Sequence, residues 1–373
     1  FMLIYGGLQL PVGLLVDRWG VVPTFGLGGA FFSVGALIFP LAVSVSGLYL
    51  ARVLIALGAS VIFLSLVKLI DRWFDSRIFA IAMGVLVFFG YSGGLLGTWP
   101  LEQATQALGW RLPLLVAGLL GLLFYGLAMT KLWRWQRPLA REGTLPPPPL
   151  LAQIQGIVRR SYWIHFSSSI NFGIYSLWQA ALGKKMLEDC CGLRPSKAAA
   201  FIFLMTLISI LCNSGIGWLS RLMGDRYRPI LIAATALTCA AAVMLVLVTA
   251  LRAPAPWFVT VLIMLAISNA SVTIFNSSIR ELNYPQSVGA AMGLNNSLCY
   301  LMVALIIMLA GVVMDQFSGL ATHTAAAIIY PPMAYCAIGL GCTVLALASM
   351  LASWRIKESW RRAPAAPAAP VIT

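Results

Sequence analysis

The sequence predicts an all-α integral membrane protein, and three observations lead to this fold class. Hydrophobic residues make up 60% of the 373 residues and charged residues only 10%, whereas an ordinary soluble domain has about 25% charged residues. Apolar runs of about 20 residues, long enough to cross the hydrocarbon core as helices, recur along nearly the whole chain. The runs are uniformly apolar, whereas the strands of a membrane barrel would alternate over about 10 residues, so helices are expected.

Eleven membrane spans are predicted in chain order. The first run covers residues 1–16 and is short, and the sequence begins with Phe, so we expect a further helix before it and twelve in the parent protein. The other ten are expected at about 24–45, 47–70, 78–101, 111–131, 162–183, 197–219, 229–251, 256–279, 286–314 and 328–353.

A polar connector at residues 133–160 divides the spans into two groups. It contains four consecutive prolines, Pro146 to Pro149, which favour an extended and semi-rigid spacer. The expected organisation is therefore an N-terminal helical bundle at 1–132, the connector at 133–160, a C-terminal helical bundle at 161–354 and a tail at 355–373.

The basic residues predict the orientation in the membrane. Alternation of the loops places 18 of the 25 Lys and Arg on the connector's side and 6 on the opposite side, with Arg52 inside a span. Because cytoplasmic loops carry the excess of Lys and Arg, we expect the connector and the tail in the cytoplasm and the protein in the inner (cytoplasmic) membrane. Orientation thus accounts for most of the net charge of +14, so the expected surroundings are the lipid bilayer and no nucleic-acid partner is predicted.

Two motifs occur once in each half of the chain. Residues 13–20, Gly-Leu-Leu-Val-Asp-Arg-Trp-Gly, return in altered form at 217–224, and residues 79–84 are echoed at 288–293, with offsets of 204 and 209 residues. Glycines in such a short turn permit close helix packing and positive φ angles. Two similar bundles on one chain are the plan of a carrier that rocks around a central site.

These motifs resemble those of the major facilitator superfamily over residues 1 to about 354. Gly13-x-x-x-Asp17-Arg18-x-Gly20 resembles the turn after the family's second helix. Arg52 with Gly58 resembles the fourth-helix motif, and the glycines between Gly90 and Gly97 resemble the fifth helix. The resemblance implies two pseudo-symmetric six-helix bundles, with 11 of the 12 helices present, and we expect a monomer. One departure is that Val21 and Val22 stand where the family usually has basic residues.

The turn predicts a set of gating residues: Gly13, Asp17, Arg18 and Gly20. The span from Gln286 begins on the same face of the membrane, so its positive N-terminal end can attract the Asp17 carboxylate and close that side. The alternative is a solvated loop charge. In the second copy Arg221 replaces Asp17, and its predicted partner is Asp75.

Polar residues at helical spacing predict a substrate site in the C-terminal half. Asn171, Tyr175 and Gln179 share one helix face, Asn269 and Asn276 share another, and Asn295 lies in the next span. The resemblance implies that these helices border the central cavity. The alternative is that the side chains only form interhelical hydrogen bonds.

Charged side chains within the spans suggest the class of substrate. Arg52 starts a turn inside the outer boundary, where a cation would attract anions or modulate a proton site, whereas Lys68 could snorkel to the cytoplasmic face. No carboxylate falls at mid-membrane, and His165 is expected near the cytoplasmic face. Either proton coupling depends on the helix expected before residue 1, or transport runs by exchange or facilitated diffusion.

We therefore expect a secondary active or facilitative transporter that moves a small solute by alternating access, with an organic or phosphorylated anion as the leading substrate. An exporter of amphipathic drug-like compounds is the first alternative, because aromatic residues such as Tyr91, Trp99 and Trp178 accompany the spans. A non-transporting sensor or assembly partner on the same fold is the second. No enzyme activity, cofactor or metal is predicted, because no His/Asp/Cys cluster has the spacing of ligands or of a nucleophile.

Overall fold

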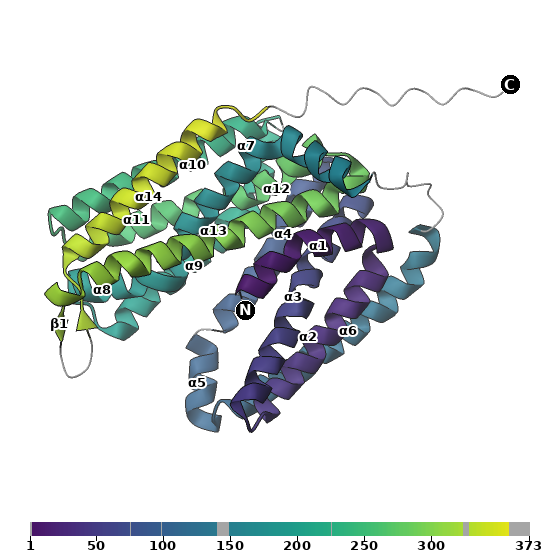
Figure 1. The fold of residues 1–373 in the computed structure, drawn as a ribbon, viewed down its shortest axis with the longest axis horizontal. Coiled ribbons are helices and arrows are strands. Elements are labelled where there is room, and N and C mark those ends of the chain that lie inside the picture. Colours follow the sequence, from purple (N-terminus) through teal and green to yellow (C-terminus); the bar gives the residue numbers. More distant parts are fainter. Residues whose placement is uncertain are drawn as a thin grey trace.

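The computed structural model describes residues 2–74, 76–97, 99–139, 149–224, 226–323 and 328–357, and these residues are almost entirely helical. The helices form two halves that meet along part of their length (Figure 1). The N half contains α1 (Met2–Trp19), α2 (Val21–Leu41), α3 (Val45–Trp73), α4 (Ser76–Leu96), α5 (Trp99–Leu108) and α6 (Arg111–Leu139).

The C half begins after the connector. It contains α7 (Leu150–Ser176), the π-helical turn η1 (Leu177–Leu182), α8 (Gly183–Cys191), α9 (Pro195–Leu222), α10 (Tyr227–Ala250), α11 (Ala255–Ser268), α12 (Ser271–Leu282), η2 (Pro285–Ser287), α13 (Val288–Gln316), η3 (Ser318–Leu320) and α14 (Pro332–Ser353). Strands β1 (Thr322–His323) and β2 (Ile328–Ile329) pair antiparallel between η3 and α14.

Each of the eleven predicted spans corresponds to a helix or a pair of helices, and eight helices in the described ranges are long and apolar enough to cross a membrane. The span predicted at 256–279 is divided into α11 and α12 at Asn269 and Ala270. There the Ser271 hydroxyl donates to the Ser268 carbonyl oxygen at 2.8 Å, and such side-chain bonds compete with the helical ladder.

The connector is more helical than the prolines predicted. α6 continues to Leu139 and α7 begins at Leu150, so both ends of the range 133–160 are helix. Pro149 has extended backbone angles just before α7, and Pro146 to Pro148 lie outside the described residues. α7 bends at Ser161, where φ is −123° and the hydroxyl donates to the Ile157 carbonyl oxygen at 2.8 Å.

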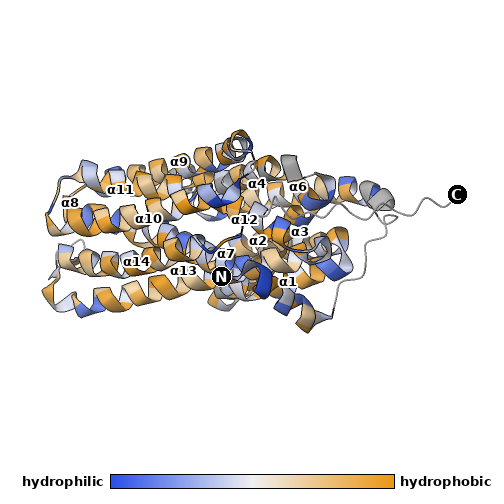
Figure 2. Ribbon diagram, turned by 90° about the horizontal axis from the view of Figure 1, so that it is seen from above, coloured by the Kyte–Doolittle hydropathy of each residue, from blue (hydrophilic) through white to orange (hydrophobic). Residues whose placement is uncertain are grey.

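Hydrophobic residues dominate the helices of both halves, as the colouring in Figure 2 shows, and many of the large apolar side chains are exposed. α6 is an example, with Leu119, Leu123 and Phe124 each about half exposed or more. Exposed apolar surface of this extent is what a lipid-facing helix requires.

The two halves contact each other through a repeated pair of helix crossings, α1 with α13 and α4 with α9. A Cβ added at Gly293 would lie 3.1 Å from the carbonyl carbon of Gln9, and one added at Gly84 would lie 3.0 Å from the carbonyl oxygen of Asn213. Gln9 and Asn213 are 204 residues apart, and Gly84 and Gly293 are 209 apart, as the sequence repeats require. The two crossings are therefore equivalent, and the predicted fold of two pseudo-symmetric bundles is confirmed.

The turn after α1 has its counterpart after α9. Gly20 has a φ of +87° and Gly224 a φ of +69°, a conformation that glycine adopts without steric cost. Both turns lie at the end of the molecule where α6 ends and α7 begins, which we call the connector end. The other end, with α5, α8 and the β1–β2 hairpin, we call the opposite end; there Figure 1 shows α5 well separated from α8.

Candidate functional site

A cavity of about 490 Å³ lies between the two halves. The N half contributes apolar and aromatic side chains from α1, α3 and α4, and the C half contributes α7, α12 and α13. The lining residues are Tyr5, Ala59, Ile62, Phe63, Leu66, Leu86, Val87, Phe89, Gly90, Ser168, Phe172, Val272, Asn276, Asn295, Asn296, Cys299 and Tyr300.

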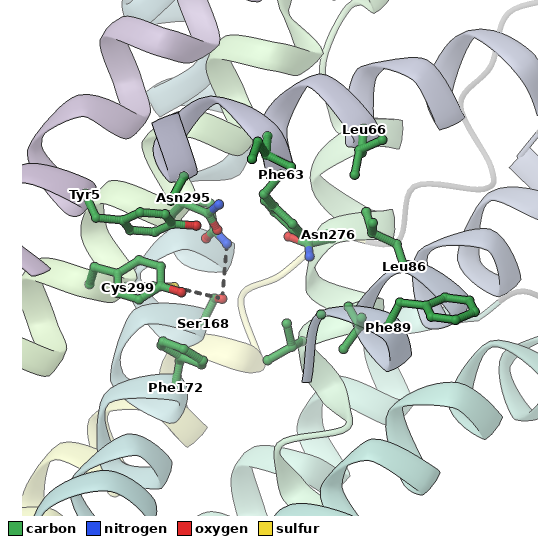
Figure 3. Close-up of a pocket in the computed structure, with 17 residues that line it drawn as sticks. Tyr5, Phe63, Leu66, Leu86, Phe89, Ser168, Phe172, Asn276, Asn295 and Cys299 are labelled. Atoms are coloured by element: carbon green, nitrogen blue, oxygen red, sulfur yellow. Dashed lines mark hydrogen bonds between the residues drawn. The ribbon is translucent and has the colours of Figure 1, made fainter. Parts of the chain in front are cut away.

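The polar side of this cavity belongs to the C half. Asn276 projects from α12, and Asn295 and Asn296 from the third turn of α13. Figure 3 shows Asn295 beside Ser168, to which its Nδ2 donates at 3.4 Å. Asn296 Nδ2 donates across to Gln9 Oε1 at 3.1 Å, so one of the three amides also joins the halves.

Aromatic rings form a second part of the wall. Tyr5 of α1 meets Tyr300 of α13 edge to face at 4.6 Å between centroids, and Phe172 of α7 meets Tyr300 at 5.6 Å. Edge-to-face pairs of this kind are favourable. None of the lining residues that the structure describes is Lys, Arg, His, Asp or Glu, so the described wall offers apolar surface with hydrogen-bonding amides and no formal charge.

Of the residues predicted for substrate binding, Asn276 and Asn295 line the cavity, and the other C-half residues lie elsewhere. Asn171 is buried between helices, where its Nδ2 donates to Ser271 at 3.1 Å and its Oδ1 accepts from Thr238. Tyr175 is buried in the core of the C half. Gln179 Nε2 donates to the Thr206 hydroxyl of α9 at 3.1 Å.

Asn269 belongs to a second polar cluster that joins α9 to the break between α11 and α12. Its Nδ2 donates to the Ser209 hydroxyl at 2.9 Å, and its main-chain oxygen accepts from Asn213 at 3.3 Å. Asn213 in turn accepts from the Thr273 hydroxyl at 3.2 Å. These contacts are hydrogen bonds between helices, which is the alternative role that the sequence leaves open for Asn269.

Arg52 is exposed on α3 towards the opposite end and is not among the residues that line the cavity. Its guanidinium lies 4.4 Å from the centre of the Phe39 ring of α2. This cation–π contact joins α2 to α3 within the N half.

Asp17 occupies the crossing of α1 and α13 at the connector end. Its Oδ1 accepts from the Gly289 backbone N–H at 3.1 Å and its Oδ2 from the Ala290 N–H at 2.7 Å. These are among the first N–H groups of α13, which have no partner within the helix. The carboxylate therefore sits at the positive end of the helix expected from the sequence. Gln153 of α7 adds a weaker contact, with its Nε2 at 3.4 Å from Oδ2.

Lys68 does not snorkel but is buried beside Asp17. Its Nζ is 3.1 Å from Asp17 Oδ1 and 3.9 Å from Asp71 Oδ2, and it donates to the Pro285 carbonyl oxygen of the C half. Asp71 also pairs with Arg280 of α12, with Nε 2.6 Å from Oδ1. Arg280 donates further to the Phe74 carbonyl oxygen at 3.0 Å. Charged groups thus join the halves at several points near the end of α3.

The other predicted gating residues are placed as follows. Gly13 lies against Gly289, since a Cβ at Gly13 would fall 2.9 Å from the Gly289 carbonyl carbon. Arg18 and Arg221 are exposed at the ends of α1 and α9. Asp75, the predicted partner of Arg221, lies outside the described residues.

Several contacts of the site were missed by sequence reasoning. Asp71 and Arg280 are 209 residues apart, the offset of the repeat, so that offset could have indicated that they face each other across the pseudo-symmetry axis. His165 is closer to the cavity than expected, because its Nδ1 is 3.2 Å from Oδ1 of Asn295. No signal in the sequence indicated that Gln153 reaches Asp17.

Comparisons with known proteins agree with this architecture. Residues 1–307 match the family model described as Major Facilitator Superfamily. A search of curated proteins found no match. Among solved structures, a bacterial homologue of the iron transporter ferroportin in the outward-facing state has a TM-score of 0.74 at 13% identity, covering 95% of this chain and 88% of that one.

Two further structures show the same fold. The human organic anion transporter MFSD10 (TETRAN) has a TM-score of 0.69 at 16% identity, covering 95% of this chain and 82% of that one. FucP in the outward conformation has a TM-score of 0.70 at 12% identity, covering 96% of this chain and 88% of that one. With most of its length matched by the family model, the chain belongs to the Major Facilitator Superfamily, a family of multi-pass membrane transporters.

Proposed function

We propose that this protein is a carrier of a small, amphipathic, predominantly uncharged organic solute, which it moves by alternating access. The observation that carries the proposal is the cavity of about 490 Å³ between the halves, apolar on the N-half side and lined by three asparagines on the other. Apolar walls with a few directed polar groups are typical of sites for small organic ligands.

The state of the gate supports alternating access. Asp17, Lys68 and Arg280 bridge the halves at the connector end, whereas α5 and α8 stand apart at the opposite end (Figure 1). If the two halves rock about the cavity, these bridges must break for the connector end to open. By the excess of basic residues we place the connector end in the cytoplasm of a cell with an inner membrane, so this state faces outward. We propose that the carrier acts as a monomer.

The composition of the cavity favours the amphipathic substrate over the anion. A buried anion is stabilised best by a cation in the cavity, because burying an unpaired charge is costly. Arg52 lies over Phe39, and Lys68 is already paired with Asp17. An uncharged solute needs only the asparagine amides and the aromatic walls.

The test uses one ring system with three charges. Naphthalene sulfonamide, naphthalene sulfonate and naphthylmethylammonium are nearly equal in shape, so their binding to the purified protein and their uptake into proteoliposomes report the preferred charge. We expect the neutral compound to bind best, and Asn276→Leu to weaken its binding while Arg52→Ala leaves binding unchanged. Preference for the sulfonate, lost in Arg52→Ala, would establish the anion instead.

Transport itself is tested separately from binding. Uptake of the bound compound into protein-containing vesicles, above that of empty vesicles, is the expected result. Binding without any such uptake would identify a sensor or assembly partner on this fold and contradict the carrier.

A further inference from the structure

His165 is a buried titratable side chain that the proposed carrier mechanism does not yet use. It lies on α7 with only 2% of its surface exposed, between the bend at Ser161 and the cavity wall at Ser168. Each ring nitrogen has a hydrogen-bonding neighbour, Ser161 at Nε2 and Asn295 at Nδ1. The two neighbours differ in whether they can donate to the ring.

On one side, Nε2 is 3.0 Å from the Ser161 hydroxyl. That hydroxyl donates its own proton to the Ile157 carbonyl oxygen at 2.8 Å, and its oxygen accepts from Asn283 Nδ2 at 3.3 Å. With its proton engaged, the Ser161 oxygen faces Nε2 as an acceptor. Nε2 therefore carries hydrogen, and the neutral ring keeps Nδ1 as its basic nitrogen.

On the other side, Nδ1 is 3.2 Å from Oδ1 of Asn295. An amide oxygen only accepts, so this arrangement satisfies a ring that carries hydrogen on both nitrogens. The Nδ2 of the same amide donates to Ser168 at 3.4 Å. Asn295 and Ser168 both line the cavity (Figure 3).

The two protonation states of the ring require opposite orientations of this amide. With Nδ1 protonated, Asn295 presents its oxygen to the ring and its NH₂ to Ser168. With Nδ1 unprotonated, the amide must turn over so that its NH₂ donates to the ring and its oxygen accepts from the Ser168 hydroxyl. Protonation of His165 therefore changes which of the donors and acceptors of Asn295 and Ser168 remain for a solute.

We propose that His165 is a proton-binding site linked to the solute cavity through the Asn295 amide, so that the carrier binds proton and solute as coupled ligands. The inference rests on the proposed function. It gives the carrier a titratable group within the spans, where the sequence places no carboxylate at mid-membrane. A hydronium ion reaching the cavity gives its proton to Nδ1 and leaves as water, and on release the same N–H bond breaks and the proton returns to water. Because Nδ1 faces the cavity side, rocking of the halves gives it access to each side in turn.

No anion among the described contacts holds the proton on the ring permanently. On α13, Cys299 contacts Ser168 at 3.7 Å, and α11 contains no charged residue. Tyr300 of α13 packs on the Phe172 ring, and Asp315 lies 20 residues beyond Asn295 on the same helix. Other titratable and basic groups near α7 have partners of their own: Arg280 with Asp71, Glu281 with Tyr227, Arg228 with the Trp354 carbonyl oxygen, Tyr335 with Asp189, and Arg355 with the Trp163 ring.

The first test is spectroscopic and needs no solute. The sequence has two histidines, 165 and 323, so ¹⁵N-histidine NMR of the protein in lipid nanodiscs gives two sets of signals, and His323→Gln assigns them. We expect the signals of His165 to change from one protonation state to the other within the pH range in which the protein stays folded, with hydrogen on Nε2 in the neutral form. Asn295→Leu should change its proton affinity roughly threefold to tenfold, and Asn171→Leu, in the separate cluster around Ser271, should not.

A ring that stays in one state over this range, or a proton affinity unchanged in Asn295→Leu, overturns the proposal. The second test measures naphthalene sulfonamide binding at pH values on either side of the titration. Its affinity should change with pH in the wild type and stay constant in His165→Gln, which still binds. A dependence of binding on pH that persists in His165→Gln contradicts the link between His165 and the solute cavity. Failure of every naphthalene probe to bind would refute the proposed solute class, while the NMR titration still decides whether His165 takes up a proton.

Discussion

Closure of the connector end depends on the close approach of α1 to α13, and Gly13→Ala is the change that tests it. The added Cβ would lie 2.9 Å from the Gly289 carbonyl carbon and 3.0 Å from the Ala290 Cα. Both atoms are backbone, so no side chain can move aside. The two helices must separate by roughly 1 Å to restore ordinary van der Waals contact.

That separation acts directly on the Asp17 carboxylate. Its hydrogen bonds to Ala290 and Gly289 are 2.7 and 3.1 Å long, so an increase of about 1 Å takes both beyond bonding distance. A hydrogen bond to a charged group contributes about 1.5–3 kcal/mol. Loss of even one bond should therefore shift the equilibrium between the closed and open connector end by roughly 10- to 100-fold.

Spin-label distances measure this shift. In a background with the seven cysteines replaced, labels at the exposed Trp19 and Leu222 report the connector end, and labels at the exposed Val43 and Leu251 report the opposite end. Gly13→Ala should lengthen the first distance and shorten the second. Gly7→Ala is the matched control, because a Cβ there meets nothing within 4 Å. Distance distributions in Gly13→Ala identical to those of Gly7→Ala would refute the proposed role of this crossing.

Four further predictions concern single side chains. Lys68→Met leaves the buried Asp17 carboxylate without its ion-pair partner. It should lower the stability measured by thermal unfolding by about 3–5 kcal/mol. The control is Lys131→Met, at an exposed lysine, which should leave the stability unchanged. Asn171→Leu should lower stability by about 1–3 kcal/mol, because it removes two buried hydrogen bonds, to the Ser271 and Thr238 hydroxyls. Asn276→Leu should weaken solute binding and leave the melting temperature unchanged, and the reverse pattern would contradict the assignment of the cavity. Arg52→Ala should remove only a cation–π contact, about 0.5–1 kcal/mol, so a large loss of solute binding in this variant would show that the cation acts at the site.

The spans were predictable because length and hydropathy alone decide which segments can cross a membrane. The break at Asn269 was not, since a helix loses its regular ladder there through local side-chain bonds such as that from Ser271 to Ser268. The mean composition of the segment is as apolar as that of an unbroken span.

The site was only partly predictable for a different reason. Asn171 and Asn276 are both asparagines in apolar helices, yet one bonds to Ser271 in a neighbouring helix and the other lines the cavity. Helical spacing shows which residues share a face, but the rotation of each helix about its axis decides what that face meets. The contact of Asp17 was predictable because it depends on helix termini, which sequence motifs mark, whereas its pairing with Lys68 depends on the packing of α1 against α3.

The pseudo-symmetry of the chain explains how charged groups come to face one another at the connector end. The glycine crossings of α1 with α13 and of α4 with α9 are equivalent in position, so the shape of the interface alone favours neither side of it. The charges break this equivalence. Asp17 has Arg221 at its corresponding position, and Asp71 has Arg280. Asp71 and Arg280 therefore pair across the symmetry axis, while Asp17 binds the N-terminus of α13 and Lys68. An axis that brings opposite charges together thus adds polar bridges to the apolar cluster that the two halves share at this end, and these polar contacts can be exchanged for water when the halves separate.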